Sequence, residues 1–230
     1  MAVRPRSSPS ASLAPFCALD LVAFTIDERG LAVLLVSPPA AGRPWQLPTA
    51  AWTRGEDIVA AGTRFASFVV GATPAWLEQV GAASDPGHPL GAELSVGWVT
   101  VAPRGTPTTG EAAWFALDDL PADLPARHRT LIRRAHTHVQ QRLDHTPVAF
   151  AFLPALFTLS SLQDVYEALL GRSVHKASFR RALAGAALVA PTDEWRSEGR
   201  GRPAQLFTLA PRPRGRRGSA RAIRFDFPVG

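Results

Sequence analysis

The stretch with the clearest chemical character is VHKASFRRALAG, residues 174–185, which has the apolar spacing of a short helix. Phe179 and Leu183 are four residues apart, so both should face a core. The polar side chains left on the outward face and its flank are Lys176, Ser178, Arg180 and Arg181. Small residues between arginines let a helix enter the major groove of DNA. The pattern predicts DNA contact, with a solvated basic face as the alternative.

More arginines lie in the glycine-rich stretch TDEWRSEGRGRP, residues 192–203. Arg200 and Arg202 suit contacts with backbone phosphates, and the same composition also suits a mobile loop without a ligand. The last basic stretch, PRPRGRRGSARAIRFDF, is predicted to add electrostatic attraction to DNA without reading its sequence.

The residues that could catalyse a reaction form no recognisable set. His136 and His138 are two apart on a predicted helix, so they face different ways, and a solvated surface is predicted for both. No Ser-His-Asp arrangement can be read from the spacing. Cys17 is the only cysteine, which excludes an intrachain disulfide and fits a core position in a reducing compartment.

The first half of the chain predicts a mixed α/β domain. ALDLVAFTI and LAVLLVSPP flank the turn DERG and read as a β-hairpin, and further strands are predicted at SVGWVTVAP and AAWFALDDL. Helical spacing of apolar residues is found over 57–70 and over 125–143. Strands around an intervening helix are typical of a layered α/β structure.

The second half predicts a winged helix. Residues 144–159 form an apolar, proline-marked connection that should pack between domains. Ser160 and Gln163 match a capping box at the start of one helix, and Gly171 is placed to end it. A second helix is expected over 174–184. Two short strands, ALVAP and AQLFTL, then flank the basic loop.

Composition sets the class of protein. The chain has 230 residues, 46% of them hydrophobic and 19% charged, which is typical of a globular protein long enough for two domains. The net charge of +6 and the pI near 11.0 favour a polyanionic partner. Asp20 and Asp27 interrupt the first apolar stretch, so we expect neither a signal peptide nor a membrane span, and we expect a cytoplasmic protein.

The two halves together resemble the Nudix-related transcriptional regulators of the NrtR type. The resemblance covers about residues 19–209 and rests on LDDLP followed by RH, on TPVAFAFLPALFTLSSLQDVYEALLGR, on SFRRAL and on GRGRPAQLF, in that order. It implies an α+β fold, a Nudix-like α/β/α sandwich followed by a small winged helix-turn-helix domain. The implied divisions are a flexible tail (1–15), a Nudix-like effector-sensing domain (16–146), a winged-helix DNA-binding domain (147–210) and a basic tail (211–230).

The resemblance also implies a degenerate Nudix box. Ala50, Glu56, Arg64 and Gly71 occupy its first glycine, first glutamate, arginine and last glycine. The three positions of its metal-binding glutamates hold Phe65, Phe68 and Val69. These positions share one helix face, and magnesium needs oxygen ligands there. We therefore predict no catalytic residue, no metal and no cofactor, and we expect the phenylalanines to favour packing of the helix.

The implied function is a DNA-binding transcription regulator, most simply a repressor. A nucleotide such as ADP-ribose would be sensed in the Nudix-like domain, with Arg43, Glu56, Arg64 and His128 as candidate ligand-binding residues; for His128 a surface position is the alternative. The other implied partners are double-stranded operator DNA and a second copy of the chain, and the implied target genes serve NAD or sugar metabolism. The alternatives are a Nudix hydrolase of the ADP-sugar pyrophosphatase kind, and a nucleic-acid-binding protein whose Nudix-like domain is purely structural.

Overall fold

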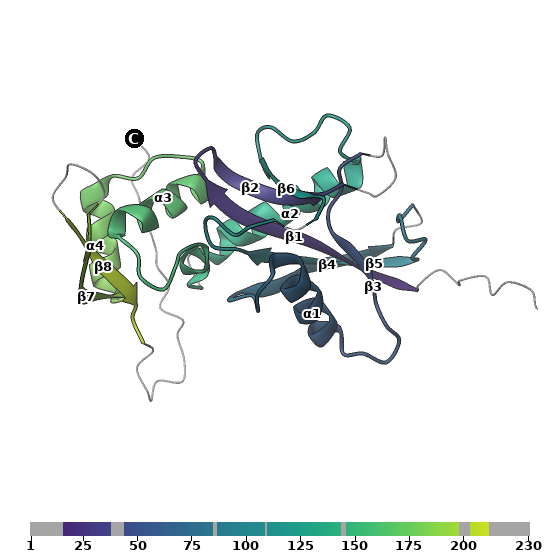
Figure 1. Ribbon diagram of the computed structural model, residues 1–230, viewed down its shortest axis with the longest axis horizontal. Helices are drawn as coiled ribbons and strands as arrows, with labels where there is room; N and C mark the ends of the chain where they lie inside the picture. The colour runs from purple at the N-terminus through teal and green to yellow at the C-terminus, as the bar shows by residue number, and fades with distance from the viewer. Residues whose placement is uncertain are drawn as a thin grey trace, which may run out of the picture.

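The computed structural model describes residues 16–37, 44–84, 87–108, 110–143, 146–197 and 203–211. Three predicted site residues, Arg43, Arg200 and Arg202, lie outside the described residues, as do nearly all of both predicted tails. The described chain forms an elongated molecule, with a large sheet and its helices at one end and a smaller helical unit with a two-stranded hairpin at the other (Figure 1).

The large sheet has six strands. They are β1 (Cys17–Asp27), β2 (Gly30–Val36), β3 (Thr49–Ala51), β4 (Leu77–Ser84), β5 (Leu94–Val101) and β6 (Ala112–Ala116). The order is β4-β5-β1-β2-β6, with β3 paired to the start of β1. The predicted hairpin is confirmed, because β1 and β2 pair antiparallel as far as Asp27 and Gly30. β1 and β5 run parallel at the centre of the sheet.

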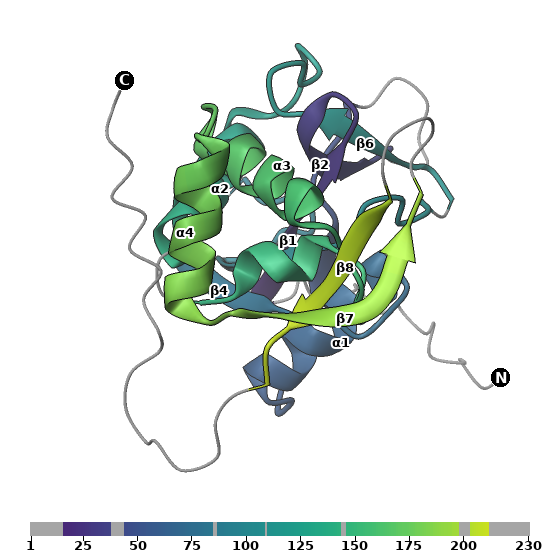
Figure 2. The same ribbon diagram turned by 90° about the vertical axis from the view of Figure 1, so that its left-hand side faces the viewer.

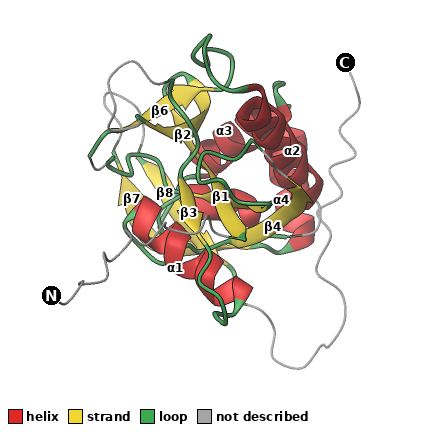
Figure 3. Ribbon diagram, turned by 90° about the vertical axis from the view of Figure 1, so that its right-hand side faces the viewer, coloured by secondary structure: helices red, strands yellow, loops and turns green. Residues whose placement is uncertain are grey.

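Two helices cover opposite faces of the sheet, α1 (Ile58–Val70) and α2 (Ala126–Arg142) (Figure 3). Successive side chains of a strand point to opposite faces, so β1 contributes to two cores. Leu19 and Leu21 pack with the buried face of α1, whereas Phe24 packs in the core that contains α2. The hydrophobic runs of β1 and β5 reflect this burial on both sides.

α1 approaches the sheet closely through a glycine. Asp57 caps the helix by accepting hydrogen bonds from Val59 N and Ala60 N, and Gly71 ends it in the left-handed conformation. A Cβ atom at Gly62 would lie 2.7 Å from the indole ring of the buried Trp98. Gly62 is therefore not merely a weak helix former, because its missing side chain makes room for the tryptophan.

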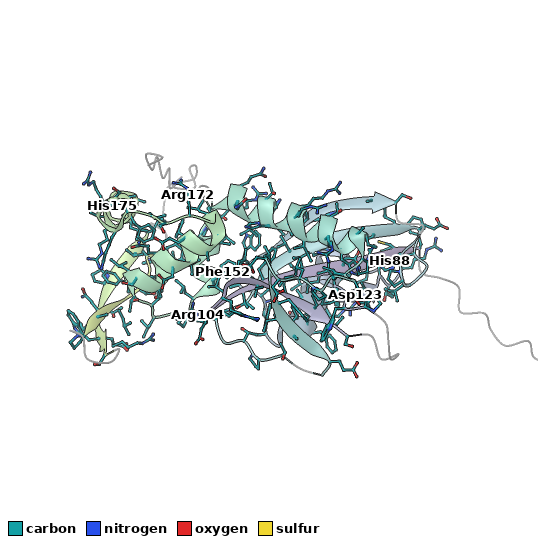
Figure 4. All side chains as sticks on the ribbon, turned by 90° about the horizontal axis from the view of Figure 1, so that it is seen from above. His88, Arg104, Asp123, Phe152, Arg172 and His175 are labelled. Carbon is teal, nitrogen blue, oxygen red and sulfur yellow. The ribbon has the colours of Figure 1, made fainter. Side chains whose placement is uncertain are left out.

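The connection between the two halves is packed as expected. Residues Val148–Phe152 form a 3₁₀ turn, η1, in which Val148, Ala149 and Phe152 are almost completely buried. Phe152 O accepts a hydrogen bond from Arg104 N at 3.2 Å, which ties this turn to the segment after β5 (Figure 4). One hydrophobic core runs from the sheet through η1 into the smaller unit.

The smaller unit comprises α3 (Leu159–Leu170), α4 (Lys176–Ala186), β7 (Val189–Arg196) and β8 (Ala204–Leu209) (Figure 2). β7 and β8 pair antiparallel, and Phe157 adds a bridge to Phe207 of β8. This is the predicted order of helix, helix and hairpin. β7 is longer than predicted, because pairing resumes at Trp195 beyond an irregularity after Pro191.

Two predicted helix boundaries are wrong. The capping box of α3 joins Thr158 and Ser161 rather than Ser160 and Gln163, because the extended backbone that precedes the helix is at Thr158. Gln163 instead donates hydrogen bonds to Glu167 Oε1 and Val174 O. α4 lies two residues later than predicted, because Ala187 rather than Gly185 adopts the left-handed conformation that ends it. Gly171 ends α3 as predicted.

Candidate functional site

α4 presents a basic surface at the end of the molecule. Phe179 and Leu183 are buried as predicted, and the Phe179 ring packs edge-on against Tyr166 with centroids 5.4 Å apart. Lys176, Arg180 and Arg181 are exposed, and Ser178 is half-buried beside His175. The sequence of α4, KASFRRALAGA, contains no acidic residue. The four predicted DNA contacts that lie on this helix are thus gathered on its exposed side and flank.

The described part of the hairpin is mixed in charge. Asp193 and Glu194 lie on β7 next to Trp195 and Arg196, and all four side chains are exposed. Trp195, with 56% of its surface exposed, is the largest of them. The predicted phosphate contacts from the loop between β7 and β8 fall outside the described residues.

On α1, the three residues at the metal positions do not form one apolar face. Phe65 is buried under the helix and Val69 packs partly against the same core, but Phe68 is 83% exposed. The expectation that both phenylalanines favour packing is therefore wrong for Phe68. Its side chain projects from the helix in a different direction from Phe65 and points away from the sheet. The sequence of α1, IVAAGTRFASFVV, contains no carboxylate.

Glu56 and Arg64 are paired with each other. Arg64 Nε and Nη2 donate to the two oxygens of Glu56 at 2.9 and 2.8 Å. The hydrogen bonds from Arg64 hold the pKa of the Glu56 carboxyl below its ordinary value. The Nε–Nη2 edge of the Arg64 guanidinium is thus occupied by a protein carboxylate, in the bidentate geometry that an anionic ligand would use.

His128 is buried rather than at the surface. Its Nδ1 accepts a hydrogen bond from Leu47 N at 3.2 Å, so the ring holds the segment before β3 against α2. The predicted surface positions of His136 and His138 are wrong, since both are half-buried. His136 Nε2 lies 3.3 Å from Leu169 O, and His138 Nε2 lies 2.8 Å from Glu78 Oε2. Each ring reaches a polar atom of a neighbouring element.

A buried carboxylate that the sequence analysis did not select lies in the middle of β1. Asp20 accepts hydrogen bonds from Ser95 Oγ and from Arg127 Nη2, the latter at 2.5 Å, and its Oδ1 lies 3.3 Å from His88 Nε2. Leu90 N donates to Nδ1 of the same histidine, which fixes the proton on Nε2. Burial raises the pKa of Asp20, but hydrogen bonds from His88 and Ser95 and the charge of Arg127 outweigh it, so the pKa is lowered.

This cluster forms one end of a cavity of about 320 Å³ between the sheet and α2. β4 contributes residues 80–84, β5 contributes Ser95 and Gly97, and α2 contributes Ala126, Arg127, Thr130, Leu131 and Arg134. None of Glu56, Arg64 and His128 lines it. Small apolar, hydroxyl and charged groups line it, which makes it a candidate ligand site. A charged residue inside the otherwise apolar run ALDLVAFTI was the signal that could have located it.

Within the described ranges, no three histidine, cysteine, aspartate or glutamate residues are grouped closely enough to hold a metal ion. Among the helices of those same ranges, none combines the length and apolarity needed to cross a membrane.

Comparison with known proteins decides the nature of the smaller unit. A family model described as the NrtR DNA-binding winged helix domain matches residues 149–209. The C-terminal domain therefore resembles an NrtR-type winged helix. Its α3, α4 and β7–β8 hairpin are the helices and the wing of that domain.

The likeness to NrtR proteins extends over most of the chain. The ADPR responsive transcriptional repressor NtrR of Acinetobacter baylyi is 27% identical over 207 residues, which cover 85% of this chain and 82% of that protein. The crystal structure of Shewanella oneidensis NrtR complexed with a 27mer DNA has a TM-score of 0.72 at 28% identity, covering 85% of this chain and 94% of that one. The predicted NrtR resemblance is therefore confirmed.

A MutT/nudix family protein from Enterococcus faecalis shares the fold, with a TM-score of 0.69 at 20% identity over 86% of this chain and 88% of that one. The predicted fold class, a Nudix-like sandwich followed by a winged helix, is confirmed. The relative from Acinetobacter baylyi is named as a repressor, not as a hydrolase.

Proposed function

We propose that this protein is a transcriptional repressor that binds operator DNA through its NrtR-type winged helix and is regulated by a nucleotide in its Nudix-like domain. The observation that carries the proposal is α4, a helix with an exposed, acid-free basic side on a domain of a DNA-binding family. The other exposed residues near Lys176, Arg180 and Arg181 are small, namely Ala177, Ala184 and Gly185, so the helix can approach base edges closely.

The proposed DNA contacts divide into two kinds. Arg181 reads a base edge, and Lys176, Ser178 and Arg180 contribute positioning contacts around it. Arg200 and Arg202 contact phosphates from the wing. We expect the chain to bind a palindromic operator as a homodimer, because the two-fold symmetry of a dimer matches the symmetry of a palindrome. We expect it to act in the cytoplasm.

The proposed effector is ADP-ribose or a related nucleotide, and the target genes serve NAD or sugar metabolism. Two observations support this effector class. The relative from Acinetobacter baylyi is named ADPR responsive, and the cavity beside Asp20 offers hydroxyl, guanidinium and small apolar groups to a sugar-phosphate compound. The residues 1–15, 16–146, 147–210 and 211–230 remain our proposed divisions of the chain.

We further propose that the chain does not hydrolyse this nucleotide. Magnesium-dependent hydrolysis needs carboxylate oxygens beside the diphosphate, whereas Phe65, Phe68 and Val69 stand at the corresponding positions of α1. Product formation from ADP-ribose should be undetectable with magnesium or manganese. Metal-dependent turnover that Glu56→Gln abolishes would establish the alternative, a Nudix hydrolase.

DNA binding is tested with a duplex selected by the wild-type protein from a random pool. Arg181→Ala should weaken binding to that duplex about tenfold or more and leave binding to a scrambled duplex nearly unchanged. Arg54→Ala, which removes an exposed arginine from the other domain, is the matched control. Equal loss on both duplexes would assign Arg181 to phosphates, and no selected duplex at all would refute the proposed function.

A further inference from the structure

α2 carries a concentration of positive charge that the proposed DNA contacts do not use. Its 17 residues, ARHRTLIRRAHTHVQQR, include arginine and histidine throughout and no aspartate or glutamate. Arg127, Thr130, Arg134, Thr137 and His138 follow one another at spacings of three or four residues, apart from the adjacent last pair. Such residues lie along one side of a helix, so this side carries side chains that can all donate hydrogen bonds.

This side of α2 forms the wall of a continuous groove. The cavity beside Asp20 and a shallower hollow of about 400 Å³ share three lining residues, Val80, Thr130 and Arg134. The second hollow continues along α2 past Arg133 and Thr137 to His138 and Gln141. β4 forms the opposite side, where the bulge between Gln79 and Gly81 interrupts its pairing with β5. α2 itself runs from the end of the molecule near His88 toward the winged helix (Figure 4).

The charges along the groove are unevenly compensated. Arg127 is paired with the buried Asp20, and Glu78 accepts hydrogen bonds from Arg142 and His138. Arg133 donates to the Thr130 hydroxyl, a neutral partner. No described carboxylate lies within ion-pair distance of Arg133 or Arg134. Since Arg134 borders both hollows, its charge is available where they meet.

We propose that the phosphates of the effector bind along α2, with Arg134 as the principal contact and Arg133 as the second. The nucleoside end then occupies the cavity beside Asp20 and Ser95. Arg127 and Arg134 are seven residues apart, or roughly 10 Å along the helix, which suits the length of a nucleoside diphosphate. An arginine without a carboxylate partner can bind phosphate in a bidentate manner, and on α1 the corresponding capacity of Arg64 is taken by Glu56.

This assignment rests on the proposed function, because it locates the effector that the function requires. Two binding positions for the diphosphate have to be distinguished. One is beside α1, as the Nudix box suggests, and the other is along α2, as the groove suggests. Each place has an exposed arginine that can be removed without disturbing a buried group, Arg64 on α1 and Arg134 on α2. The two variants are therefore a matched pair.

The experiment measures binding of ADP-ribose, AMP, adenosine and pyrophosphate in excess chelator by calorimetry. Arg134→Ala should weaken ADP-ribose binding about tenfold or more, and Arg133→Ala/Arg134→Ala should weaken it further. Adenosine, which lacks phosphate, should bind wild type and both variants alike. Arg64→Ala should retain the wild-type affinity for ADP-ribose. Thermal unfolding of each variant confirms that it is folded.

Three outcomes would overturn the proposal. Loss of ADP-ribose affinity in Arg64→Ala but not in Arg134→Ala would place the diphosphate on α1 and leave the proposed function standing. Weaker DNA binding by Arg134→Ala without nucleotide would make this side of α2 a DNA contact. Failure of wild type to bind any of the four compounds would remove both this inference and the effector half of the proposed function, while DNA binding in the same samples tests the other half.

Discussion

At the scale of single residues, Asp20 is part of a candidate site that local sequence patterns do not reveal. A carboxylate that is fully buried must be compensated by hydrogen bonds and charge. Its partners come from distant parts of the chain, His88, Ser95 and Arg127, and no local spacing links them. The sequence could therefore indicate that Asp20 is unusual, but the identity of its partners depends on the parallel pairing of β1 with β5 and on the position of α2.

The lowered pKa of Asp20 predicts a pH dependence of stability. Because the carboxyl has a lower pKa in the folded than in the unfolded chain, its contribution is present above about pH 4 and is lost as the pH falls through the folded pKa. Asp20→Asn should lower the free energy of unfolding at pH 7 by about 3 kcal/mol. Urea unfolding from pH 7 to pH 3 should show this difference shrinking on acidification.

The control for this measurement is Asp27→Asn, which removes a surface ion pair with Arg29 and should cost less than about 1 kcal/mol. A difference between wild type and Asp20→Asn that stays constant down to pH 3 would contradict the role assigned to the charge.

For Gly62→Ala, the structure predicts a change in stability opposite in sign to the one that helix propensity predicts. Helix propensity alone makes alanine about 1 kcal/mol more stable than glycine in a helix interior. The Trp98 ring fills the space of a Cβ at this position, so Gly62→Ala should instead destabilise the protein by about 1–3 kcal/mol. Chemical unfolding of the variant measures this.

Adding Trp98→Phe should recover most of the loss, because the smaller ring makes room and the Trp98 Nε1 has no hydrogen-bond partner in the described part of the chain. The matched control is Ala60→Gly at an exposed position of α1, which should cost about 1 kcal/mol. A stabilising Gly62→Ala would show that the helix can move away from the sheet.

At the scale of elements, those with a strong periodic pattern were predicted and those without one were not. β1, β2, β5 and α2 have apolar patterns that match the structure. β4, with the sequence LEQVGAAS, is an edge strand whose exposed half carries glycine, alanine and serine. It pairs because β5 lies beside it, and this tertiary cause leaves no pattern in its own residues.

α2 also connects the groove to the winged helix. We therefore predict that its second half couples ADP-ribose binding to DNA binding. Gln140 Nε2 donates to Leu169 O at 2.8 Å, and His136 Nε2 lies near the same carbonyl in the last turn of α3. His136→Ala/Gln140→Ala should leave separate affinities for DNA and ADP-ribose within about twofold. The effect of ADP-ribose on DNA affinity, expected to be about tenfold, should fall toward unity.

This coupling is measured by titrating selected DNA with and without saturating ADP-ribose. Arg54→Ala, in the same assay, should keep the wild-type ratio. Unchanged coupling in the double variant would mean that the signal passes through η1 or another contact instead.

At the scale of the whole molecule, the predicted fold class was confirmed, but the predicted ligand residues that the structure describes lie in two separate places. Glu56 and Arg64 lie by α1, whereas His128 is buried on α2, which covers the opposite face of the sheet. A resemblance assigns residues to positions of a motif, but Phe65, Phe68 and Val69 cannot supply the carboxylate oxygens for which those positions are known. The groove along α2 arises from packing between distant elements, so only the folded chain displays it.

The continuous core predicts that the two domains unfold together. η1 links the sheet to α3 through buried side chains, among them Phe152, which is 1% exposed. Urea unfolding followed by far-UV circular dichroism and by tryptophan fluorescence should give coincident single transitions.

Phe152→Ala should lower the stability by about 3–5 kcal/mol and shift both signals equally. Phe68→Ala, which truncates a phenylalanine that is 83% exposed, should change it by less than about 0.5 kcal/mol. Two separate transitions in wild type, or a Phe152→Ala effect confined to one signal, would show that the domains are energetically independent and that the junction cannot carry a signal between effector and DNA.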